Sequence, residues 1–157
     1  MSQKDEFIEF LSRAITEISQ DVKVMFEMMD DPEFSEATRL RTAGALLYLL
    51  APGDLIPDTF GLLGQADDCL VMRLTMQFVL NQKPERADHY RERYPEVFDH
   101  LEEDLEISAG FLGEIYPWLE EYLEKLDAIE FKGKKAQDVI EDVDTNSWLF
   151  DEINKGA

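Results

Sequence analysis

The stretch YLLAPGDLIPDTFGLLGQADD, residues 48–68, joins two apolar segments through a loop rich in proline, glycine and aspartate. The segment before it, AGALLYLL (43–50), is apolar on nearly every side, and the segment after it is CLVMRLTMQFVL (69–80). Pro52 and Pro57 cannot lie inside a regular helix, because proline lacks the amide hydrogen and clashes with the preceding turn. The sequence therefore predicts a helix–loop–helix hairpin whose two helices are buried from several directions.

The same stretch resembles the YkvA-like domain of unknown function. The family pattern Y-L-x-x-P-x-D-L-I-P-D, followed by G-x-x-D-D, is matched here by Tyr48, Leu49, Pro52, Asp54, Leu55, Ile56, Pro57, Asp58, Gly64, Asp67 and Asp68. Two positions depart from the pattern: Gly61 replaces a second proline, and Ala66 replaces a larger apolar residue. The resemblance extends over about Arg39–Leu80. It implies a known module but no known activity.

Helical periodicity extends over the rest of the chain. Apolar residues at steps of three and four predict a helix over 5–29, which Asp31-Pro32 ends, and Ser35 is the expected N-cap of the next helix. After the hairpin we expect helices over 65–80, 85–93, from Pro95 to about 107, and 111–129, with FKGKK as a basic turn and a last helix near the end. No stretch alternates with period two. The prediction is a single all-α domain over 1–157, a bundle of five to seven helices.

Composition limits the function classes. The chain has 157 residues, 45% of them hydrophobic, and a formal net charge of −20. That charge opposes binding to nucleic acid or to anionic lipid, and the apolar runs are shorter than the about 20 residues a membrane span needs. A membrane adaptor role is thus disfavoured. The single cysteine and the absence of an apolar leader lead us to expect a cytoplasmic protein.

Four aspartates of the hairpin form the first candidate site: Asp54, Asp58, Asp67 and Asp68. Converging carboxylates bind divalent cations such as Mg²⁺ or Ca²⁺, and crowding also shifts their pKa values. The alternative is structural. Asp67 and Asp68 fall in the first turn of a helix, where they complement its positive end, and Asp54 and Asp58 are ordinary turn residues. We favour the structural interpretation and keep metal binding as the alternative.

A second candidate site comes from a repeated pattern, E-x-x-D-H, in ERADH and EVFDH. The repeat places Glu85 with His89, and Glu96 with His100, on one helix face each, a pair of faces that could bind Zn²⁺ or iron. Di-iron bundles space glutamate and histidine three apart and need further carboxylates. Pro95 also separates the two units. A solvated polar face is therefore the favoured interpretation.

The remaining candidates are single features. Cys69 begins an apolar run and is expected to be a core residue, and Arg73 is a candidate partner for one of the loop aspartates. An acidic helix containing Trp118 and Tyr122 could dock a basic partner, although a solvated face is commoner. The sequence thus favours a non-enzymatic interaction or structural module with an unknown protein partner and no cofactor. The alternative is a divalent-metal-binding protein or metal-dependent enzyme using the aspartate cluster.

Overall fold

The computed structural model describes residues 2–50 and 66–155, and the side chains from Asp68 onward in the second range. Three helices form its centre: α1 (Gln3–Asp30), α2 (Glu36–Tyr48) and α3 (Ala66–Gln82). Helix α1 ends before Pro32, as predicted, and Ser35 caps α2 by accepting a hydrogen bond from the Thr38 amide at 3.2 Å. The apolar patterns that predicted these helices therefore located them correctly, to within two residues at most ends.

The second half of the chain is divided more finely than the sequence suggested. Its elements are α4 (Pro84–Arg93), α5 (Pro95–Phe98), α6 (Leu101–Leu112), α7 (Ile115–Leu123), η2 (Leu126–Ala128), β1 (Glu130–Phe131), β2 (Lys134–Lys135), α8 (Ala136–Glu141) and α9 (Val143–Lys155). The break predicted at 108–110 is wrong, because α6 continues through it and ends at Gly113, whose φ of 57° suits glycine. Pro117 lies in the first turn of α7, where proline is tolerated.

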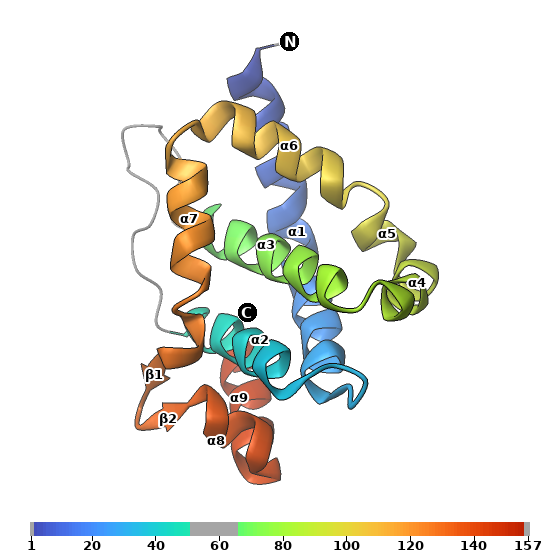
Figure 1. The fold of residues 1–157 in the computed structure, drawn as a ribbon. Coiled ribbons are helices and arrows are strands. Elements are labelled where there is room, and N and C mark those ends of the chain that lie inside the picture. Colours follow the sequence, from blue (N-terminus) through green and yellow to red (C-terminus); the bar gives the residue numbers. More distant parts are fainter. Residues whose placement is uncertain (1, 51–65, 156–157) are drawn as a thin grey trace.

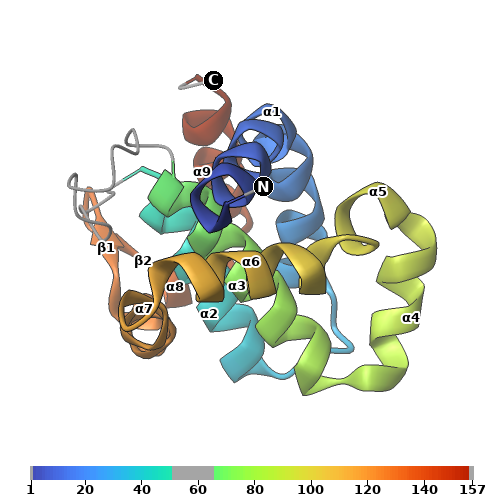
Figure 2. The ribbon, with the colours of Figure 1, turned by 90° about the horizontal axis from the view of Figure 1, so that it is seen from above.

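Helix α1 runs along the molecule and organises the other elements around it (Figure 1). Helices α2, α3 and α6 pack against α1, while α2 also packs against α8 and η2. Figure 2 shows α6 crossing in front of α3, with α4 and α5 at one side of the molecule. The hairpin helices are consequently covered from several directions: residues 45–48 of α2 and residues 69–72 of α3 are at most 1% exposed. The all-α prediction is confirmed.

Gly44 allows an unusually close approach between α2 and the chain around η2. A Cβ atom built on Gly44 would lie 2.1 Å from the carbonyl oxygen of Leu126 and 3.0 Å from the amide nitrogen of Asp127. Any side chain there would overlap the backbone of the neighbouring segment. Glycine is thus required at this position by the packing of α2 rather than by its own backbone geometry.

A small β-hairpin is the one described departure from helical structure that the sequence analysis missed. Glu130 pairs with Lys135, and Phe131 with Lys134, in an antiparallel register. The FKGKK turn between them has positive φ at Lys132 (52°) and Gly133 (77°), the conformation of a two-residue hairpin turn. The basic turn was predicted, but two-residue strands are too short to produce an alternating pattern.

Candidate functional site

The most unusual polar residue of the described structure is Arg73, which lies in the middle of α3 with only 1% of its surface exposed. Its Nε atom donates to Asp21 Oδ2 at 2.7 Å, and its Nη2 atom donates to Glu17 Oε2 at 3.1 Å. A third carboxylate, Asp104 Oδ2, lies 3.8 Å from Nη1. Since Glu17 and Asp21 belong to α1 and Asp104 to α6, this one guanidinium group links three helices.

Arg13 extends this arrangement toward the surface. Its Nη2 atom donates to Asp104 Oδ1, and its Nε atom lies 3.7 Å from Glu17 Oε1. We call Arg13, Glu17, Asp21, Arg73 and Asp104 the interior charge cluster. It contains three carboxylates and two guanidinium groups, so it carries one excess negative charge when all five are ionised. An open groove of about 340 Å³ between α1 and α6 reaches its outer edge, at Arg13 and Asp104.

Within the cluster, Asp21 is completely buried. Burial raises the pKa of the Asp21 carboxyl from 3.8 to about 6, although the neighbouring Arg73 opposes this by favouring the ionised form. Asp21 Oδ1 accepts no hydrogen bond from the described residues, whereas Oδ2 is bound to Arg73. Burial lowers the pKa of Arg73, but the carboxylates of Asp21 and Glu17 raise it by more, so the guanidinium group stays charged.

Sequence reasoning did not predict this cluster. The partners that Arg73 shows here come from α1 and α6, whereas the loop aspartates Asp54 and Asp58 lie outside the described residues. A signal was present in α1, where Arg13, Glu17 and Asp21 are spaced four apart and so share one face. That face lies alongside the apolar stripe of α1 and so hints at buried charge, but it does not identify the partners in α3 and α6.

The four-aspartate site remains a prediction. Asp54, Asp58 and the side chain of Asp67 lie outside the described part of the molecule. Asp68 is described: it lies in the first turn of α3, partly buried and next to Cys69. Its position in the first turn is the one expected from the sequence and places its charge near the positive end of the helix.

Cys69 is a core residue, as predicted, with none of its surface exposed. Burial raises the pKa of its thiol to about 12, and the negative charges of Asp21 and Asp68 act in the same direction. The thiol is therefore protonated at neutral pH. Because the thiolate is the reactive form of cysteine, the buried Cys69 is unsuited to act as a nucleophile.

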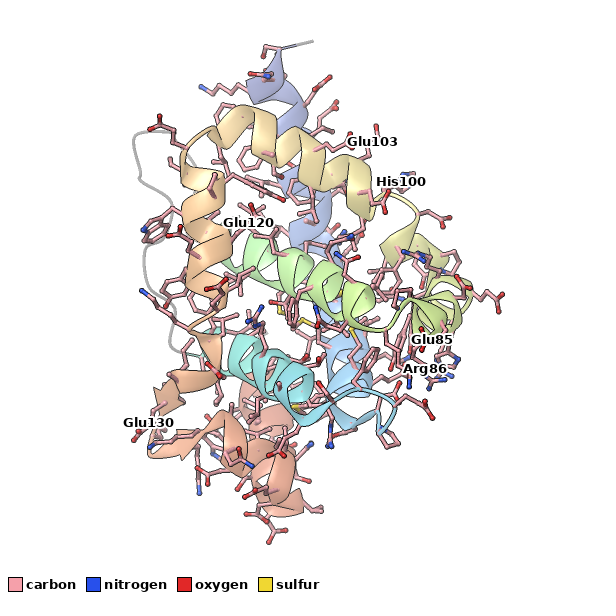
Figure 3. The ribbon with its side chains drawn as sticks, viewed as in Figure 1. Glu85, Arg86, His100, Glu103, Glu120 and Glu130 are labelled. Carbon is pink, nitrogen blue, oxygen red and sulfur yellow. The ribbon has the colours of Figure 1, made fainter. Side chains whose placement is uncertain are left out.

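The residues of the second candidate metal site are all exposed. Glu85 and His89 lie on α4, Glu96 lies on α5 and accepts a hydrogen bond from Gln20, and His100 precedes α6. Figure 3 shows Glu85 and His100 at separate places on the surface. Among the residues described, no three His, Cys, Asp or Glu side chains are arranged to hold a metal ion. The structure thus does not bring these four residues together.

A second polar arrangement that sequence reasoning missed is centred on Asp31, which follows α1. Its Oδ2 atom accepts hydrogen bonds from Arg86 Nε at 2.8 Å and from the Tyr90 hydroxyl at 2.7 Å. Its Oδ1 atom accepts one from the Glu33 amide at 2.9 Å. These bonds lower the pKa of Asp31 in spite of its burial. The carboxylate is fully occupied and fixes α4 against the end of α1, which is a structural role.

Helix α7 carries a group of aromatic side chains that reaches the solvent. Leu119 and Leu123 face inward and are at most 5% exposed, whereas Trp118 is 48% exposed. The Trp118 ring stacks on Tyr122, with centroids 5.9 Å apart and planes inclined by 27°. Tyr122 in turn meets the buried Tyr48 of α2 edge-on at 6.2 Å. An aromatic row therefore leads from the hairpin to the surface.

One known protein family matches the hairpin segment of the chain. Residues 38–74 match the model of a family described as a protein of unknown function, DUF1232. The match is to a segment. YkvA-like domains are members of that family, so the resemblance predicted over about Arg39–Leu80 is confirmed. The matched residues include Arg73 and Cys69, while the partners of Arg73 in α1 and α6 lie outside them.

The other comparisons add no relative. Neither the search of curated proteins nor the search of solved structures found a match. Among the helices of the described residues, none has both the length and the low polarity needed to cross a bilayer.

Proposed function

We propose that the protein is a non-enzymatic interaction or structural module in which the 38–74 hairpin is held inside a helical frame supplied by the rest of the chain. The observation that carries this proposal is the position of Arg73. Arg73 is a buried charged residue of the hairpin, and its guanidinium group is bound to carboxylates of α1 and α6. A cation used in this way fixes helix positions and is unavailable to a substrate.

The reactive groups at the buried contact between the hairpin and α1 support the same proposal. Cys69 is buried, and its raised pKa keeps it as the thiol. Asp21, whose pKa of about 6 would suit an acid or base, is completely buried and bonded to Arg73. A catalytic acid or base must reach its substrate directly or through one water molecule. These residues therefore support a scaffold better than a catalytic site.

Exposed apolar side chains support the interaction part of the proposal. Among the described residues, the large hydrophobic side chains that are exposed are Ile8, Trp118, Val143 and Phe150. Single exposed hydrophobic residues are common. Trp118 stacks on the partly buried Tyr122 and is connected through it to Tyr48 of the hairpin.

The proposal is tested by site-specific photocrosslinking in cells that produce the protein. A photoreactive phenylalanine analogue would replace Ile8, Trp118, Val143 or Phe150, one at a time, with the exposed Glu102 as control position. We expect a discrete adduct with another protein from at least one apolar position and none from Glu102. Co-production of an excess of the native protein without the analogue should suppress the adduct. The same unspecific mixture of adducts from all five positions, or the absence of an adduct at every position, would contradict an interaction role.

A further inference from the structure

The segment from Glu114 to Glu130 holds a concentration of negative charge that the protein does not neutralise. It contains one basic residue, Lys125, and six acidic ones: Glu114, Glu120, Glu121, Glu124, Asp127 and Glu130. All six are exposed. None of their carboxylates forms an ion pair or hydrogen bond with the described residues. Figure 3 labels Glu120 on α7 and Glu130 at the edge of the molecule.

Elsewhere several of the described arginines and lysines form ion pairs with carboxylates of the protein itself. Arg86 binds Asp31, Arg93 binds Glu27, and Lys83 binds Glu33, each at 2.8–2.9 Å. Unpaired glutamates also occur elsewhere among the described residues, as at Glu102 and Glu106 of α6. What distinguishes the α7 segment is that its acidic residues lie close in sequence to an exposed tryptophan, Trp118.

Trp118 lies within this charge on the outward side of α7. Glu114 precedes it by four residues and Glu121 follows it by three, so both share its helix face. Its ring is held by stacking on Tyr122, and Leu119 and Leu123 anchor the opposite face of the helix in the core. The indole face is consequently presented in a fixed orientation. A rigid aromatic anchor reduces the entropy that binding costs.

Such a surface matches the guanidinium group of arginine. A cation above an indole ring is attracted by the ring's quadrupole, and a guanidinium also donates two parallel hydrogen bonds to a carboxylate. The described residues contain arginine–aromatic contacts of their own; in one of them, the Arg41 guanidinium carbon lies 3.9 Å from the centroid of the Phe78 ring. An acidic rim also accelerates the approach of a basic partner.

We propose that the outward face of α7, defined by Glu114, Trp118 and Glu121, is a docking surface for an arginine-rich segment of a partner protein. This inference rests on the proposed function and deepens it. An arginine of the partner lies over the Trp118 ring and is paired with Glu114 or Glu121. Anionic lipid and a second copy of this chain are both repelled by the acidic face. The partner is thus a basic protein segment.

The test is fluorescence anisotropy with a labelled twelve-residue peptide of alternating arginine and serine, at 150 mM salt. We compare the native protein with Trp118→Ala, Trp118→Phe, Glu114→Gln/Glu121→Gln, and the charge-matched control Glu102→Gln/Glu106→Gln on α6. Glu102 and Glu106 are exposed, so the control removes the same charge at another place. Thermal melts of each variant verify folding.

We expect Trp118→Ala to weaken binding by about three- to fivefold, which corresponds to one exposed cation–π contact. Trp118→Phe should retain part of the affinity. The Glu114→Gln/Glu121→Gln variant should lose more affinity than its control, and an alternating lysine–serine peptide should bind more weakly than the arginine peptide. Titration of a Trp148→Phe protein should change the emission of Trp118, then the sole tryptophan.

Equal affinities of Trp118→Ala and the native protein would overturn the inference, as would equal losses in the two glutamine pairs, because both indicate attraction by net charge alone. The proposed function would survive that result if crosslinking gave an adduct from Phe150 or Ile8. Conversely, an absence of crosslinked adducts from every position would remove the proposed function, whatever the peptide binds.

Discussion

The Nε atom of Arg73 lies 2.7 Å from Oδ2 of Asp21, with both residues at most 1% exposed. Arg73 comes from the centre of α3 and Asp21 from the middle of α1. The bond therefore fixes the position of the hairpin along α1. Buried ion pairs contribute little net stability relative to well-packed apolar residues, but the loss of one partner leaves a charge unpaired in the interior.

The first prediction concerns the removal of the cation. Arg73→Met leaves Asp21, Glu17 and Asp104 without their shared partner, and it should lower the free energy of unfolding by about 3–5 kcal/mol. Urea denaturation at pH 7 measures this. The control is Arg91→Met, which removes an exposed pair with Asp88 at 3.7 Å and should cost less than about 1 kcal/mol. Equal effects of the two substitutions would show that Arg73 has no special structural role.

The second prediction concerns pH. The Asp21 carboxyl has a pKa of about 6 in the folded protein and 3.8 as its ordinary value, so the unfolded chain releases this proton first as the pH rises. The contribution of Asp21 to stability is therefore fully present below about pH 4 and is lost as the pH rises through about 6. The loss should be on the order of 1–3 kcal/mol.

Asp21→Asn isolates this effect, because asparagine cannot ionise but can still accept a hydrogen bond from Arg73. Asp31 and Asp142, whose pKa values are lowered, act in the opposite direction and titrate equally in both proteins. Urea denaturation at a series of pH values should show the native protein losing stability relative to Asp21→Asn between about pH 4 and 7. A constant difference over that range would mean that Asp21 is ionised without penalty.

The third prediction concerns the close approach at Gly44. Gly44→Ala forces a methyl group against the Leu126 carbonyl, to which the built Cβ is only 2.1 Å away, so α2 and η2 must separate. We expect a loss of at least about 3 kcal/mol, at the upper end of the cost of overpacking, because backbone rather than a flexible side chain must move.

Gly110→Ala is the matched control for that substitution. Its Cβ would lie 3.2 Å from the end of the Gln3 side chain, which is free to rotate away, and Gly110 lies within α6. Alanine has the higher helix propensity, so this variant should be neutral or more stable by about 0.5–1 kcal/mol. A loss of stability in Gly44→Ala no larger than that in Gly110→Ala would contradict the close approach between α2 and η2.

The sequence predicted the α-class and the buried hairpin because both depend on local patterns: apolar periodicity over ten or more residues, and prolines in fixed places. The sequence did not predict the features that depend on contacts between distant parts of the chain. The interior charge cluster joins Glu17, Arg73 and Asp104, which are distant in the chain, and no single-segment pattern reports such a meeting. The continuation of α6 through Gly110 was missed for a similar reason, since glycine is tolerated in a helix that packing stabilises.

The last prediction addresses the aspartates of the hairpin, for which we favour a structural role over a divalent-metal site. Asp67 and Asp68 lie in the first turn of α3, where negative charge stabilises a helix without any metal. We therefore expect millimolar Mg²⁺, Mn²⁺ or Ca²⁺ to shift the melting temperature of the native protein no more than that of Asp67→Asn/Asp68→Asn. A ligand at a hundredfold excess over its dissociation constant stabilises by about 2.7 kcal/mol, so a real site would be visible. A large shift confined to the native protein would favour the metal-binding alternative. A shift shared by both proteins would reflect screening of the −20 net charge.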